Sequence, residues 1–151
     1  MKLLLRSLAL LPIAASSIYA SDWTTDYKAA LVQARAQHKL ALLDFTGSDW
    51  CQFCKSLEEE VLTQPEFQRY AVQTFVLVTI DFPRKTQLPD DLKRQNAELE
   101  KEFQPNGFPT LVVVDSDGKQ LGRIVGYDPG SGPQAVIDEL RGIVKDIKYS
   151  Q

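Results

Sequence analysis

The pattern of apolar positions divides the chain after Ser21 into extended and helical segments. Residues 40–45 (LALLDF), 74–82 (TFVLVTIDF) and 110–115 (TLVVVD) are short, nearly continuous apolar runs. Such runs are typical of strands that are buried on both faces of a sheet. Residues 120–127 (QLGRIVGY) predict a fourth strand, because the turn-forming sequence DSDG directly precedes it.

Helical periodicity separates these strands. Apolar residues recur every three or four positions in residues 24–39, 51–61, 90–103 and 133–147. A further helical stretch over residues 63–72 has Pro65 in its first turn, where the missing N–H costs nothing. Thr24 or Thr25 is the expected cap of the first helix.

The order of elements predicts an α/β protein. Helices between buried strands imply parallel pairing among the first strands, and the tight turn requires an antiparallel pair at the end. We therefore expect a central four-stranded mixed sheet flanked by helices on both faces. The 151 residues are enough for one such domain with a single core.

Composition and charge exclude several classes of partner. The chain is 44% apolar and 25% charged, with a formal net charge of −3, as in ordinary globular proteins. It has no run of lysine and arginine, so no nucleic acid is expected as a partner. We expect a monomer.

The first twenty residues have the pattern of an export signal. Basic Lys2 and Arg6 precede an apolar run over residues 8–15, and small residues follow as far as Ala20. Cleavage after Ala20 would leave a mature domain of residues 21–151. An uncleaved anchor is the alternative, but the apolar run is shorter than the ~20 residues that a spanning helix needs. We expect a periplasmic or other extracytoplasmic location, where disulfides persist.

Cys51 and Cys54 are the only cysteines of the chain. They follow the first buried strand and stand at the predicted start of a helix. Unpaired N–H groups and the helix dipole stabilise a thiolate there, so the pKa of Cys51 should be lowered. Cys54 lies one turn further on, where it can attack a mixed disulfide. The position and spacing together predict a reversible dithiol/disulfide couple.

Other interpretations of the pair remain open at this stage. A structural disulfide would close a loop of about four residues and contribute roughly 2 kcal/mol. A zinc site needs about four ligands, and the single histidine, His38, is distant in sequence. The pair could also be vestigial in a binding module. His38 itself ends a predicted helix, where a histidine more often interacts with the helix C-terminus than acts as a base.

The motifs as a set resemble the thioredoxin superfamily, and in particular the exported thioredoxin-like proteins of bacteria. The resemblance is carried by LLDFTGSDWCQFC (residues 42–54), by NGFPT (residues 106–110) and by the final strand–turn–strand–helix order. It covers roughly residues 23–147. It implies a thioredoxin-like fold in which Cys51 is the attacking thiolate and Cys54 the resolving thiol.

The resemblance also implies a substrate-binding face. Pro109 would follow a cis peptide bond, so that the Phe108–Pro109 backbone lies beside the sulfurs and pairs with an extended substrate strand. Trp50 would line the rim. Trp50 and Phe53 supply aromatic surface that can hold an extended peptide.

Asp44 matches the buried acid of the family, which exchanges a proton with the resolving thiol. Burial in an apolar strand should raise its pKa. Asp44 precedes Cys51 by seven positions, one more than in thioredoxin itself, so we expect residues 46–49 to form a bulge, with Asp49 as the alternative acid. No lysine occupies residues 75–81, where thioredoxin has one that faces the acid.

The predicted activity is that of a thiol:disulfide oxidoreductase. No nicotinamide or flavin motif is present, so no cofactor is expected beyond the Cys51–Cys54 disulfide. Exported proteins with disulfides are the expected substrates, and a membrane electron-carrier protein is the expected redox partner. Gln52 and Phe53 carry no charge to stabilise a thiolate strongly, which favours a reductase. A disulfide oxidase or isomerase and a redox-silent peptide-binding module are the alternatives.

Overall fold

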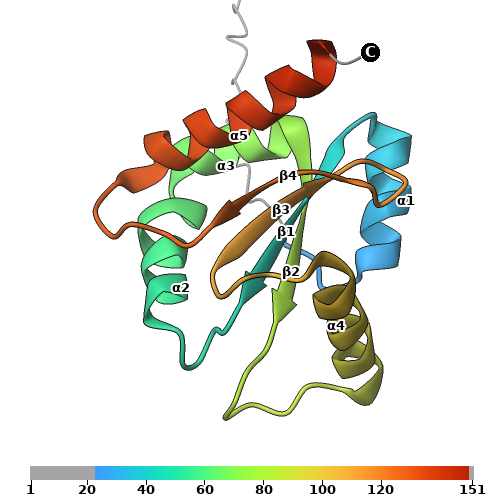
Figure 1. Ribbon diagram of the computed structural model, residues 1–151, viewed down its shortest axis with the longest axis vertical. Helices are drawn as coiled ribbons and strands as arrows, with labels where there is room; N and C mark the ends of the chain where they lie inside the picture. Colours follow the sequence, from blue (N-terminus) through green and yellow to red (C-terminus); the bar gives the residue numbers. More distant parts are fainter. Residues whose placement is uncertain (1–22, 150–151) are drawn as a thin grey trace, which may run out of the picture.

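A computed structural model describes residues 23–149, so the predicted export signal lies outside the described residues. Four strands form one sheet in the order β2-β1-β3-β4 (Figure 1). The strands are β1 (Leu40–Thr46), β2 (Phe75–Asp81), β3 (Thr110–Val114) and β4 (Gln120–Val125). The predicted four-stranded mixed sheet is therefore confirmed.

Helices cover both faces of this sheet. They are α1 (Tyr27–Gln37), α2 (Gln52–Leu57), the π-helix η1 (Glu58–Leu62), α3 (Pro65–Thr74), α4 (Asp90–Phe103) and α5 (Gly132–Tyr149). Their buried side chains show that α1 and α4 pack on one face, whereas α2, η1, α3 and α5 pack on the other. Among the helices of residues 23–149, none is both long and apolar enough to cross a bilayer.

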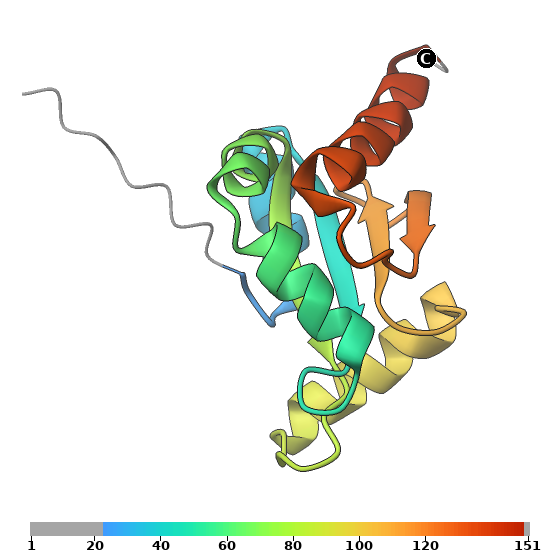
Figure 2. The same ribbon diagram turned by 90° about the vertical axis from the view of Figure 1, so that its left-hand side faces the viewer.

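The pairing of β3 differs from the prediction. β1 and β2 are parallel, as expected, but β3 runs antiparallel to β1, with Phe45 opposite Thr110. Residues 82–89 extend beyond the edge where β2 ends, and α4 returns the chain only to that same edge (Figures 1 and 2). The chain therefore enters β3 from the edge at which β1 leaves the sheet, and the prediction of parallel pairing is wrong for this strand.

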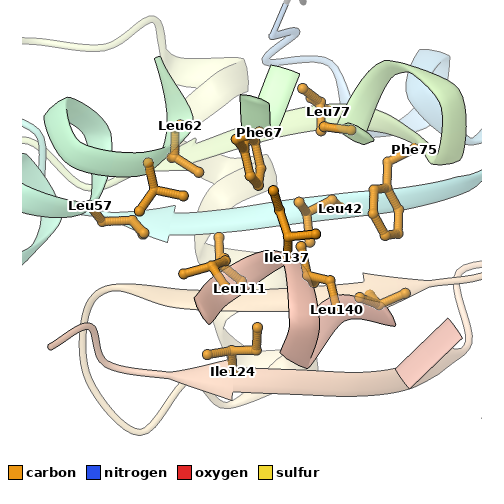
Figure 3. Packing of buried hydrophobic residues seen from close by; sticks show 14 residues of the cluster. Leu42, Leu57, Leu62, Phe67, Phe75, Leu77, Leu111, Ile124, Ile137 and Leu140 are labelled. Atoms are coloured by element: carbon orange, nitrogen blue, oxygen red, sulfur yellow. The ribbon is translucent and has the colours of Figure 1, made fainter. Parts of the chain in front are cut away.

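The sheet separates two hydrophobic cores, so the prediction of a single core is wrong, and side chains of β1 alternate between the two. Leu42 belongs to the core under α3 and α5, whereas Ala41 and Leu43 belong to the core under α1 and α4. Figure 3 shows Leu42 meeting Phe67 of α3 and Ile137 of α5. Both cores exclude water, because the side chains named here from β1, α3 and α5 are fully or almost fully buried. β1 is thus a central strand whose carboxyl end is held firmly in place.

Candidate active site

The two cysteines lie where β1 leaves the sheet and α2 begins. Cys51 is the N-cap of α2, and its Sγ accepts a hydrogen bond of 3.2 Å from the backbone N–H of Cys54. A disulfide joins the two residues, and both are nearly buried, at 6% and 4% exposed. The predicted position at a helix start is confirmed, and with it the N–H environment that stabilises a thiolate.

The additional residue before the cysteines lies in a turn and does not bulge the strand. β1 pairs with β2 without interruption as far as Thr46. The Gly47 carbonyl then accepts hydrogen bonds from the N–H groups of Trp50 and Cys51, at 3.2 and 2.8 Å. A side chain on Gly47 would collide with the Trp50 ring, so this glycine allows the indole to fold back onto the turn.

Pro109 reaches the cysteines through the antiparallel pairing of β3. The Phe108–Pro109 peptide bond is cis, as the resemblance implied. Pro109 directly precedes β3, and β3 begins opposite the end of β1. The Phe108 carbonyl oxygen consequently lies 3.7 Å from Cys51 Sγ. With β3 parallel to β1, the same residues would stand at the opposite edge of the sheet.

Asp44 lies beneath the cysteine pair. It shares the face of β1 that carries Leu42, and with Cys54 and Glu58 it lines a pocket of 380 Å³. The side chain is 5% exposed, and its Oδ1 has no hydrogen-bond partner among the described residues. Burial, followed by the nearby charges of Glu58 and Asp81, raises the pKa of Asp44 to about 8.

Asp49, the alternative acid, binds the backbone of the loop that follows β2. Its carboxylate accepts hydrogen bonds from the backbone N–H groups of Arg84, Lys85 and Thr86, at 2.9, 2.7 and 3.1 Å. These bonds, the one from Arg84 first, lower the pKa of Asp49. Of the two candidate acids, Asp44 and not Asp49 shares a pocket with Cys54.

Comparison with known proteins agrees with this geometry. A family model described as a thioredoxin-like domain matches residues 27–141. The chain belongs to the thioredoxin-like family.

Similar proteins also indicate the activity of this thioredoxin-like chain. The "Disulfide bond reductase DsbH" of Chlamydia pneumoniae is 37% identical over 134 residues, which are 89% of this chain and 77% of that protein. A solved structure titled "DsbH Oxidoreductase" is 33% identical, with a TM-score of 0.76 over 93% of this chain and 94% of that one. The reduced C-terminal domain of Neisseria meningitidis DsbD is 28% identical, with a TM-score of 0.57 over 76% and 91% of the two chains. This chain is a protein-disulfide oxidoreductase.

An aromatic cluster flanks the disulfide of this thioredoxin-like domain. The Trp50 and Phe108 rings lie 5.9 Å apart, and Phe82 stacks on Phe108 at 5.3 Å. Trp50 Nε1 donates a hydrogen bond of 2.8 Å to the Phe82 carbonyl oxygen. Phe82 carries no separate signal in the sequence, because it ends the run of residues 74–82, whose other apolar members are buried in the core.

Phe53 lies apart from this cluster. It is 55% exposed, and it lines a groove of 690 Å³ with Val125 and Tyr127. The Tyr127 hydroxyl donates a hydrogen bond of 2.7 Å to Glu60. This bond connects the groove to η1, which directly follows α2. The predicted substrate-binding aromatics therefore lie in two separate places, Trp50 and Phe108 in the aromatic cluster and Phe53 in the groove.

His38 lies away from the site. It caps the C-terminus of α1 with a positive φ of 53° and precedes the first residue of β1, whereas Cys51 follows the last. The seven residues of β1 separate the two ends by roughly 20 Å. Within residues 23–149, no three His, Cys, Asp or Glu side chains gather as metal ligands would.

Proposed function

We propose that this oxidoreductase is an extracytoplasmic disulfide reductase of exported proteins. The observation that carries the proposal is the position of Cys51, which caps α2 and lies 3.7 Å from the Phe108 carbonyl. A relative that is 37% identical and named a disulfide bond reductase supports the direction of electron flow.

The first chemical step is attack by Cys51 on a client disulfide. The Cys51 thiolate bonds to one client sulfur, the client S–S bond breaks, and the departing client thiolate takes up a proton. The N–H of Cys54, 3.2 Å from Cys51 Sγ, and the positive end of α2 stabilise the attacking thiolate. The product is a mixed disulfide between Cys51 and the client.

The second step releases the client. The Cys54 thiol loses its proton and attacks Cys51 Sγ. The Cys51–Cys54 disulfide forms, the mixed disulfide breaks, and the client sulfur that was bonded to Cys51 leaves as a thiolate, which is then protonated. Two electrons pass in this way from the Cys51/Cys54 dithiol to the client. Asp44 lines the same pocket as Cys54. Its pKa of about 8 is close to the roughly 8.5 of an ordinary thiol, so a proton can pass between the Cys54 thiol and the carboxylate form of Asp44 at little cost in free energy. We assign to Asp44 the role of accepting the proton that the Cys54 thiol loses.

The client is held as an extended segment over the Phe108–Pro109 backbone. The Pro109 carbonyl is already bonded to the N–H of Gly126 at 2.8 Å, so the Phe108 carbonyl, which faces the sulfur, is the acceptor offered to the client. Trp50 on one side and Phe53 on the other supply apolar contact surface. Main-chain pairing of this kind binds many sequences, as a reductase with several clients requires.

The residues between the cysteines support reduction over oxidation. Strong oxidants stabilise the reduced form through a greatly lowered thiolate pKa. Gln52 and Phe53 are uncharged and exposed, and neither adds a positive charge beside Cys51. The dithiol should therefore give up its electrons more readily than that of a strong oxidant.

Location and recycling complete the proposal. Residues 1–20 act as the export signal, and cleavage after Ala20 leaves the domain of residues 21–151. A dithiol electron carrier of the membrane returns two electrons and two protons to the Cys51–Cys54 disulfide. The couple itself is the only redox group that this cycle uses.

Two measurements test this function. The reduced protein should reduce insulin, and Cys51→Ser should abolish the activity, whereas Ser56→Ala in the same helix should retain it. Equilibration with glutathione should give a potential near the roughly −270 mV of thioredoxin. A value near −120 mV, which is typical of a strong oxidant, would contradict the direction, and insulin reduction by the Cys51→Ser variant would contradict the mechanism.

A further inference from the structure

The loop of residues 82–89 is built onto the active site. Three consecutive N–H groups of this loop, those of Arg84, Lys85 and Thr86, donate to the carboxylate of Asp49, which stands two residues before Cys51. The Trp50 indole donates to the Phe82 carbonyl at the start of the loop. Bonds at both places fix the loop backbone relative to the cysteines, at the edge of the sheet where β1 and β2 end (Figure 1).

This anchoring places one cation against the rim of the site. The Arg84 guanidinium carbon lies 3.7 Å from the centroid of the Trp50 ring, in a cation–π contact. Trp50 in turn contacts Phe108, whose carbonyl faces Cys51 Sγ. The guanidinium therefore borders the surface on which an extended client segment would lie.

The hydrogen-bonding edge of this guanidinium is available to a ligand. Within residues 23–149, Arg84 forms no ion pair with a carboxylate, and its side chain is exposed. Of the nearby acids, Asp49 binds the loop backbone, and Asp81 accepts hydrogen bonds from the N–H and hydroxyl of Ser48, at 2.9 and 2.6 Å. Glu100 lines a pocket with Arg84 but forms no ion pair with it. Exposed Lys85 adds a second positive charge to the same loop.

A stacked arginine is well suited to bind a carboxylate. Packing on the indole restricts the planar guanidinium before any ligand arrives, so less side-chain entropy is lost on binding. The fork of N–H donors can then take both oxygens of a carboxylate. Nothing in the attack of Cys51 or Cys54 on a disulfide uses this group.

We propose that Arg84 is a specificity-determining residue that recognises a glutamate or aspartate side chain next to the reactive cysteine of the client. The inference rests on the proposed reductase function and names a preferred class of substrate, namely disulfides flanked by acidic residues. The contact lies at the rim of the site, so it raises the rate of encounter and the occupancy of the complex without altering the chemistry of the sulfurs.

The test compares two peptides that differ in one charge. Each carries a single cysteine in mixed disulfide with 2-mercaptoethanol, and the neighbouring residue is glutamate in one peptide and glutamine in the other. The readout is the ratio of the two second-order rate constants for reduction by the full mature protein. Glutamate itself slows thiolate attack equally for every variant, so only changes in this ratio between variants report on Arg84.

Arg84→Gln should lower the glutamate-to-glutamine ratio about threefold, the size expected for a partly exposed ion pair. Arg84→Lys should keep part of the preference, because it retains the charge without the fork. Arg141→Gln is the matched control, since Arg141 also stacks on an aromatic ring, that of Tyr70, but belongs to α5 at the other end of the molecule (Figure 1). It should keep the wild-type ratio. The preference of the wild type should shrink in 1 M salt.

The outcomes separate this inference from the function on which it rests. Reduction of both peptides with the same ratio in the wild type and in Arg84→Gln would overturn the role of Arg84 and leave the reductase standing. Failure of the wild type to reduce either peptide would overturn the proposed function, and the inference with it.

Discussion

Asp44 places a carboxyl group where little water reaches its charge. The side chain is almost fully buried, and burial, Glu58 and Asp81 together raise its pKa to about 8. In the unfolded chain the same group ionises near 4. Between these values the folded protein holds one more proton than the unfolded chain, so its stability falls as the pH rises.

Replacement of Asp44 by asparagine should remove this pH dependence. For the oxidised wild type, the free energy of unfolding should fall by about 1.4 kcal/mol per pH unit between roughly pH 4 and pH 8, beyond the slope from other groups. Asp44→Asn should flatten the profile by that amount, as measured by urea denaturation at a series of pH values. Exposed Asp128 offers the control Asp128→Asn, which should keep the wild-type slope. Parallel profiles for wild type and Asp44→Asn would contradict the raised pKa.

Among the elements, the helices around the site differ most from their sequence prediction. Periodicity predicted one helix over residues 51–61, but the structure divides this stretch into α2 and the π-helix η1. α1 is capped by Asp26, whose carboxylate accepts from the Ala29 N–H at 2.9 Å, and not by Thr24 or Thr25. At its other end α1 stops at His38, in the left-handed region that favours glycine.

His38→Gly should therefore stabilise the protein. Glycine adopts a positive φ without the cost that a side chain adds, although its greater freedom in the unfolded chain offsets part of the gain. We expect the free energy of unfolding to rise by a few tenths to about 1 kcal/mol. His38→Ala retains the strain and should bring no gain, and insulin reduction should be unchanged in both variants. Loss of activity in both would show that His38 takes part in catalysis.

For the whole molecule, the decisive feature is the direction of β3. Because β3 is antiparallel to β1, the residues before β3 meet the residues after β1, and one edge of the sheet collects the cysteines, the cis proline and the loop of residues 82–89. Asp44 lies just inside this edge, on the face that α2 covers. The two cores on either side of the sheet hold these parts together, and the residues at this edge carry the chemistry.

The redox state should be linked to the stability of the whole fold. A strong oxidant is more stable when its cysteines are reduced, and a reductase has the opposite preference. Reduction of Cys51–Cys54 should therefore lower the midpoint of thermal unfolding, measured at one pH with and without a phosphine reductant. The Cys51→Ser variant is the control, because it cannot form the disulfide and should be insensitive to the reductant. A higher midpoint for the reduced wild type would favour an oxidase.

The sequence by itself determined the strands, most of the helices, and the cysteine pair at a helix start. These features depend on local periodicity, on turn residues and on a spacing of three, and all of them can be read within a few neighbouring residues. The resemblance to thioredoxin added the roles expected of Asp44 and Pro109, because LLDFTGSDWCQFC and NGFPT are specific motifs.

Tertiary structure alone decided the direction of β3, the binding of the Asp49 carboxylate to the loop backbone, and the contact of Arg84 with Trp50. Each of these depends on groups that are separated by tens of residues and are brought together by the packing of helices on the sheet. Apolar periodicity indicates that a strand is buried, but it does not indicate from which edge of the sheet the chain enters that strand. The edge at which β3 begins depends on where α4, the helix before it, packs on the sheet.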